Sequence, residues 1–135
     1  MVILFIAKDY SRFSALVTRL GHQRDIQLVP ALTGTAGLAY LKDSTVDLAI
    51  VDEQLDDMSG IALVKQLVKV NPLVNTAIIS TLSAEDFHEE TEGLGVLMQL
   101  PPQPRAGDAE ALLAVLEKIG GLMPSRRRPP QAAAL

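Results

Sequence analysis

Three polar residues of this chain have side chains that could serve one site, because each lies at or just after an apolar run. Asp9, Asp52 and Ser80 are these residues. Two carboxylates, together with a backbone carbonyl and waters, suit a hard cation such as Mg²⁺. A serine hydroxyl can donate to a phosphate oxygen held beside that cation. The alternative is that Asp9 and Asp52 only cap helices and loops, as single aspartates commonly do.

The elements that must position these side chains begin with five short apolar runs. The runs are mostly continuous rather than alternating, which is typical of strands covered on both faces in a parallel sheet. They are Val2 to Ala7, Ile26 to Pro30, Val46 to Val51, Thr76 to Ser80 and Val96 to Leu100.

The segments between and after these runs have helical spacing of their apolar residues. Ser59 and Asp108 are predicted to cap the third and last helices, and Gly120-Gly121 to end the last one. The stripes are Phe13 to Leu20, Leu38 with Leu41, Ile61 to Val68 and Leu112 to Ile119, and acidic residues crowd a fourth helix after Ser83. Five alternations of strand and helix predict a doubly wound α/β domain with a parallel sheet.

The predicted topology decides where the polar residues meet. In an open parallel sheet, sites form outside the carboxyl ends of the strands. If the first and third strands are neighbours, Asp9 and Asp52 converge on one shallow pocket and lie close enough to share a cation.

Composition limits the function classes. The chain has 135 residues, which fits one domain, and its net charge of -4 argues against nucleic-acid binding by the domain. It has no cysteine, no apolar run long enough to cross a membrane and no signal-peptide pattern. We therefore expect a cytoplasmic domain without membrane contact.

Residues 122–135 differ from the rest of the chain. They contain Arg126 to Arg128 between prolines and show no apolar period. We expect the domain to span residues 1–121 and this basic, proline-rich segment to be a flexible tail or linker. A nucleic-acid or membrane patch is the alternative.

The stretch DLAIVDEQLDDMSG, from Asp47 to Gly60, resembles the third strand and following loop of bacterial response-regulator receiver domains. The likeness extends from Met1 to about Gly120 and includes Glu92 to Gly95 and Leu100 to Pro102. It implies the flavodoxin-like (βα)5 fold, strand order 2-1-3-4-5, and a role in two-component phosphorelay signalling.

The resemblance also implies a role for each candidate residue. Asp52 falls on the phosphoacceptor and Ser80 on the switch hydroxyl. Asp9 and Asp52, with the backbone carbonyl of Gln54, fall on the Mg²⁺ ligands.

Several positions depart from the family pattern. Lys8 stands where the family has its first acidic residue, and Pro101 where it has the lysine that contacts the phosphoryl group. Met98 replaces an aromatic residue, and Asp56 replaces a loop proline. These departures predict weak Mg²⁺ binding and impaired or atypical phosphorylation of Asp52.

Lys8 suggests a more specific hypothesis. Its ammonium could pair with Asp52 and stand in for both the cation and the missing lysine; the alternative is that it extends into water. We also predict a cis bond between Pro101 and Pro102, because X-Pro bonds adopt this form at small cost.

The resemblance implies a sensor histidine kinase or another signalling protein as partner, and a homodimer through the fourth and fifth helices. The acidic fourth helix is either a solvated face or a docking surface. A pseudo-receiver that works through protein contacts alone is the alternative function. An enzyme is not expected, because a dehalogenase-type hydrolase needs an Asp-x-Asp motif that Ala7 to Asp9 does not supply.

Overall fold

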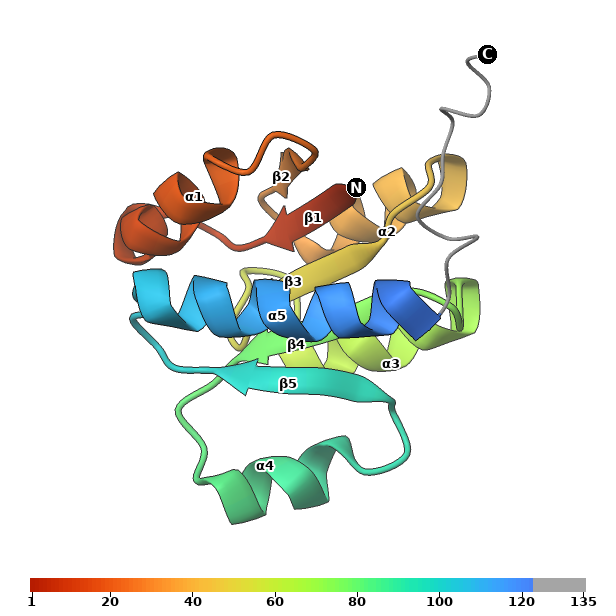
Figure 1. The fold of residues 1–135 in the computed structure, drawn as a ribbon. Helices are drawn as coiled ribbons and strands as arrows, with labels where there is room; N and C mark the ends of the chain where they lie inside the picture. The colour runs from red at the N-terminus through yellow and green to blue at the C-terminus, as the bar shows by residue number, and fades with distance from the viewer. Residues whose placement is uncertain (123–135) are drawn as a thin grey trace.

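The computed structural model describes residues 1–122 and shows a five-stranded parallel sheet in the order β2-β1-β3-β4-β5 (Figure 1). The predicted fold class and strand order are therefore confirmed. The strands are β1 (Val2–Ile6), β2 (Gln27–Ala31), β3 (Leu48–Asp52), β4 (Asn75–Ile79) and β5 (Val96–Leu100). The helices are η1 (Ser11–Phe13), α1 (Ser14–Gly21), α2 (Gly34–Asp43), α3 (Gly60–Val70), α4 (Ala84–Thr91) and α5 (Ala106–Leu122).

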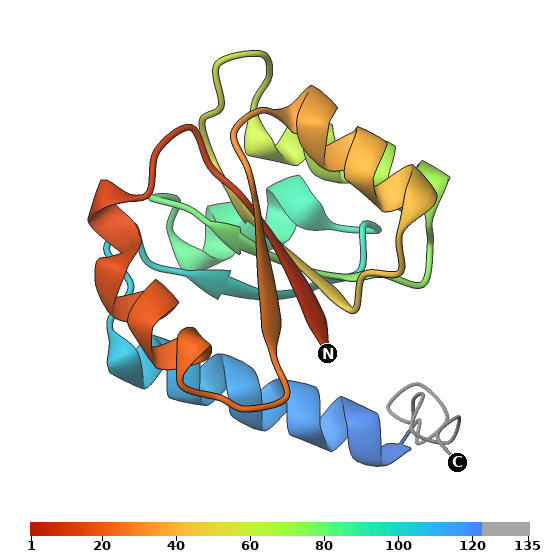
Figure 2. The same ribbon diagram turned by 90° about the horizontal axis from the view of Figure 1, so that it is seen from above.

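The helices form two layers, one on each face of the sheet (Figure 2). On one face, α1 and α5 pack on β1, β3 and β4 through residues such as Phe13, Leu16 and Leu112. On the other face, α2, α3 and α4 supply Leu41, Leu63 and Phe87 to a second core. All five residues of β3 are buried, which explains why its apolar run is continuous rather than alternating.

The element boundaries follow the sequence closely, with two exceptions at α5. Ser59 caps α3 as predicted, since its Oγ accepts a hydrogen bond from the amide of Ala62. The predicted cap Asp108 is wrong: α5 begins at Ala106, and Asp108 lies in its first turn and accepts from the amide of Arg105. A residue that reaches back from the first turn has the same sequence signature as a cap.

The predicted end at Gly120-Gly121 is also wrong, because α5 continues to Leu122. The predicted tail lies, apart from its first residue, outside the described residues. Within residues 1–122, no helix is long and apolar enough to cross a membrane.

Candidate functional site

Asp52 is the last residue of β3 and is nearly fully buried, with 1 % of its surface exposed. One carboxylate oxygen, Oδ1, accepts a hydrogen bond from the amide of Glu53 at 2.9 Å. The other, Oδ2, accepts from Nη2 of Arg12, also at 2.9 Å. Burial raises the pKa of Asp52 above its ordinary value, and the Arg12 charge and the Glu53 amide partly offset that increase.

The cation on Asp52 is therefore Arg12 rather than Lys8. Lys8 is exposed and forms no ion pair within the described part of the chain, so the hypothesis that it pairs with Asp52 is wrong and the alternative, extension into water, agrees with the structure. Arg12 lies in η1, just after the loop that follows β1, and its second nitrogen, Nη1, donates to the carbonyl of Pro102 at 3.0 Å. Its guanidinium also lies 4.7 Å from the centre of the Phe13 ring.

Asp9 caps the loop after β1, which is the alternative role that the sequence left open for this residue. Its Oδ1 accepts from both the amide and the hydroxyl of Ser11, and these bonds lower the pKa of Asp9. The next residue, Tyr10, fastens the loop to the sheet: its hydroxyl donates to the carbonyl of Phe5 and accepts from the amide of Ala31. This loop therefore places Arg12 over the end of β3.

Ser80 directly follows β4, at the strand end where the sequence places it, and is buried. Its Oγ accepts from the amide of Leu82 at 3.0 Å, so the hydroxyl closes a local turn of the β4–α4 loop. The neighbouring Thr81 is held by Glu53, whose Oε1 accepts from the Thr81 amide at 2.9 Å and from its hydroxyl at 3.2 Å. The carboxylate of Glu53, the residue after Asp52, thus holds the β4–α4 loop in place.

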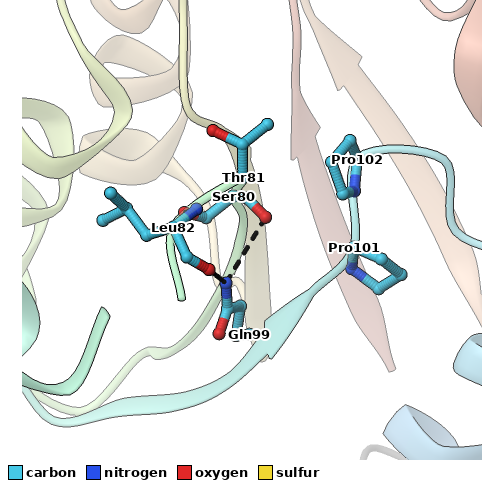
Figure 3. Close-up of a pocket in the computed structure, with 6 residues that line it drawn as sticks. All are labelled: Ser80, Thr81, Leu82, Gln99, Pro101 and Pro102. Atoms are coloured by element: carbon cyan, nitrogen blue, oxygen red, sulfur yellow. Dashed lines mark hydrogen bonds between the residues drawn. The ribbon is translucent and has the colours of Figure 1, made fainter. Parts of the chain in front are cut away.

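Gln99 of β5 holds the same loop from the other side (Figure 3). Its side-chain amide donates to the carbonyl of Leu82 at 2.8 Å and to that of Ser80 at 3.4 Å. An open pocket of about 390 Å³ lies between this loop and the end of β5, and neither Asp9 nor Asp52 lines it. The residues that line it are Ser80, Thr81, Leu82, Gln99, Pro101 and Pro102.

The loop between β3 and α3 is fastened at both ends. Asp57 accepts hydrogen bonds from the amides of Gly34 and Thr35 at the start of α2, and these bonds lower its pKa. At the start of α3, Gly60 packs against the backbone of Asp52, where a Cβ atom would lie 2.3 Å from the Asp52 carbonyl oxygen. Gln54 pairs with Ser59 across the loop in an isolated antiparallel bridge.

The end of β5 supplies no cation. Neither residue at the end of this strand is a lysine: Leu100 is fully buried, and Pro101 is exposed. All peptide bonds of the described residues are trans, and the predicted cis bond between Pro101 and Pro102 is wrong.

These residues fit a divalent cation poorly. Both oxygens of Asp52 already accept hydrogen bonds, one of them from a guanidinium, and Oδ1 of Asp9 accepts two from Ser11. Among residues 1–122, no group of three or more His, Cys, Asp or Glu side chains could hold a metal ion. Mg²⁺ in proteins takes near-octahedral oxygen coordination, and the Arg12 guanidinium on the buried Asp52 carboxylate opposes it.

Sequence reasoning missed three residues of this site: Arg12, Glu53 and Gln99. Arg12 had a signal, since it is a long cationic side chain three residues after Asp9 and in the first turn after β1. Glu53 and Gln99 act on backbone groups of a loop whose position only the folded chain reveals.

A sequence model of the response regulator receiver domain matches residues 4–101. The chain belongs to this family. The receiver domain is 28 % identical over 88 residues to the regulatory protein VanRc of Enterococcus gallinarum, a match that covers 65 % of this chain and 37 % of that protein. The chain thus matches well under half the length of this curated relative.

Solved structures show the same fold. A CheY-like receiver domain protein from Methanospirillum hungatei JF-1 is 19 % identical, with a TM-score of 0.74 over 87 % of this chain and 94 % of that one. The receiver domain of Francisella response regulator 1452 is 20 % identical, with a TM-score of 0.75 over 87 % and 98 %. At these identities the likeness supports the receiver fold and leaves the chemistry of the site to be argued from the residues.

Proposed function

We propose that this receiver domain is a two-component signalling module in which Asp52 is the phosphoacceptor position and its phosphorylation is impaired. The observation that carries the proposal is the ion pair between Arg12 and the buried Asp52. A carboxylate attacks phosphorus through a free oxygen, and here Oδ2 is engaged by the guanidinium while Oδ1 accepts from Glu53.

The other residues support the same conclusion. No lysine ends β5, and Lys8 stands in place of an acid. Mg²⁺, where it binds, is expected to bind weakly through Asp9, Asp52 and the Gln54 carbonyl. We propose that the domain is not an enzyme and receives its signal from a sensor histidine kinase or another signalling protein.

The second candidate is a pseudo-receiver that binds partners without phosphorylation. The hydrogen bonds of Glu53 and Gln99 to the β4–α4 loop favour it, because they hold this loop without any group on Asp52. A homodimer through α4 and α5 is proposed in either case, on the resemblance alone.

Intact-mass measurement with acetyl phosphate and Mg²⁺ tests the proposal. The expected result is slow, incomplete addition of one phosphoryl group, which Asp52→Asn abolishes. Complete labelling within minutes would contradict the impairment, and labelling that survives Asp52→Asn would contradict the role of Asp52. No labelling under any condition, with partner binding unchanged in Asp52→Asn, would favour the pseudo-receiver.

A further inference from the structure

Arg12 connects two parts of the molecule that lie far apart in the sequence. It reaches Asp52, forty residues on, with Nη2, and Pro102, ninety residues on, with Nη1. Because each contact uses a different nitrogen of one planar guanidinium, the two contacts share a single rigid group. A lysine ammonium on this stem is a point charge and lacks that fork.

Two cations reduce the negative charge around Asp52. Lys8 and Arg12 are positive, and Asp9, Asp52 and Glu53 are negative. The Glu53 carboxylate accepts from Thr81 but keeps its charge, which also acts on Asp52. A cluster of carboxylates attracts a divalent cation through its net negative charge, and Lys8 and Arg12 leave these five groups with a formal charge of only -1.

We propose that Arg12 is a built-in counter-ion that takes the place of a divalent cation at Asp52 and ties the charge of this carboxylate to the segment after β5 at Pro102. The proposal depends on the proposed function only in treating Asp52 as the signalling residue. A change of charge at Asp52 acts on Nη2, and the same guanidinium holds the Pro102 carbonyl. The segment between β5 and α5 therefore responds to Asp52 directly.

The first test is Mg²⁺ binding by calorimetry, with Arg12→Gln as the variant. Arg19→Gln is the matched control, because it removes an arginine ion pair of α1 on the outer surface, with Glu110. The wild type and the control are expected to bind Mg²⁺ at least about tenfold more weakly than Arg12→Gln, since one contacting positive charge is removed from Asp52 only there. Equal affinities in all three would overturn the proposal.

Lys8→Asp separates the role of Arg12 from that of general charge. It changes the local charge by two units, whereas Arg12→Gln changes it by one. We expect Lys8→Asp to improve Mg²⁺ binding less than Arg12→Gln, because the guanidinium still engages Oδ2. A larger gain in Mg²⁺ affinity from Lys8→Asp would overturn the proposal. It would mean that the positive charge near Asp9, and not the Arg12 contact with Asp52, prevents metal binding.

The link to Pro102 is tested by amide chemical shifts at Gln103, the residue after Pro102. Asp52→Asn is expected to move this signal in the wild type, and to move it at least about threefold less in the Arg12→Gln background, as for coupled sites. Arg12→Lys keeps the charge and is expected to behave like Arg12→Gln here. An unchanged Gln103 signal in Asp52→Asn would overturn the link.

These outcomes are separable from those of phosphorylation. If acetyl phosphate never labels Asp52, the phosphoacceptor role fails, while the Mg²⁺ and Gln103 results still decide the role of Arg12. If the wild type binds Mg²⁺ as tightly as Arg12→Gln yet labels slowly on Asp52, the counter-ion proposal fails and the proposed function stands.

Discussion

Two regions of this receiver domain contain the same kinds of residue, an arginine–carboxylate ion pair and a glycine at the start of a helix, but differ in how deeply these residues are buried. The inner site, made of Arg12, Asp52 and Gly60, has an arginine–carboxylate pair and a glycine at the start of a helix. The outer seam, made of Arg19, Glu110 and Gly107, has the same parts. The side chain of Asp52 is 2 % exposed and that of Glu110 is 59 % exposed.

This difference in exposure predicts that burial, rather than the kind of contact, decides how much each ion pair and each glycine contributes to stability. A buried carboxylate without its partner keeps the full cost of desolvation, whereas an exposed one exchanges its partner for water. A glycine packed against backbone tolerates no side chain, whereas one that faces open space does. The inner site should therefore contribute more to stability than the outer seam, and matched substitutions in the two regions test this.

The largest difference is expected between the two glycines. Gly60→Ala places a Cβ atom 2.3 Å from the Asp52 carbonyl oxygen, and this backbone atom cannot move aside cheaply. We expect a loss of about 2–4 kcal/mol in the free energy of unfolding, the upper range for overpacking. Urea denaturation measures it. Gly107 has nothing within 4 Å of such a Cβ, so Gly107→Ala should be neutral or slightly stabilising. Equal losses at both positions would refute the comparison.

The sequence predicted the scaffold of the inner site better than its contacts. The strand of Asp52 was predictable because a central parallel strand must be apolar along its whole length. The contact of Arg12 was not, because the choice between Lys8 and Arg12 depends on which loop residue faces β3, and Tyr10 sets that orientation through bonds to Phe5 and Ala31. The start of α5 was misjudged at Asp108 because capping and first-turn residues share one pattern. Its end was misjudged at Gly120-Gly121 because the residues near a helix end locate that end only to within one or two positions.

The second largest effect is expected for Arg12→Gln. It leaves Asp52 buried with only the Glu53 amide as partner, and should cost about 1–3 kcal/mol, less than a fully buried pair because the Arg12 side chain is 41 % exposed. Urea denaturation at pH 7 measures the loss. The control is the same substitution in the Asp52→Asn background, where the charge is absent and most of the loss should disappear. A loss of equal size in that background would mean that Arg12 stabilises by packing on Phe13 instead.

The pH dependence of Asp52 gives a third, smaller effect. Because its pKa is raised in the folded state, stability falls as pH rises from the unfolded value, near 3.8, through the folded pKa. Arg12 opposes this shift, so Arg12→Gln should raise the pKa of Asp52 further. The stability lost in Arg12→Gln should then grow across this pH window and shrink below it. Carboxyl ¹³C NMR titration of Asp52 in both proteins measures the shift; an unchanged or lower pKa in Arg12→Gln would contradict it.

The smallest effect is expected at the outer seam. Arg19 donates to Glu110 and lowers the pKa of that carboxyl, so this pair contributes above the ordinary pKa of glutamate and is lost as pH falls through the lowered value. Because Glu110 is largely exposed, water and salt replace the arginine readily, and Arg19→Gln should change the unfolding midpoint barely beyond error at pH 7. What change there is should vanish at about 1 M NaCl, where the Debye length is about 3 Å. The inner pair should keep most of its contribution under the same salt, because Asp52 is shielded from it. If Arg19→Gln instead lost as much stability as Arg12→Gln, and lost it at high salt as well, the exposed pair would stabilise the domain as much as the buried one. The predicted difference in stability between the two regions would then be disproved.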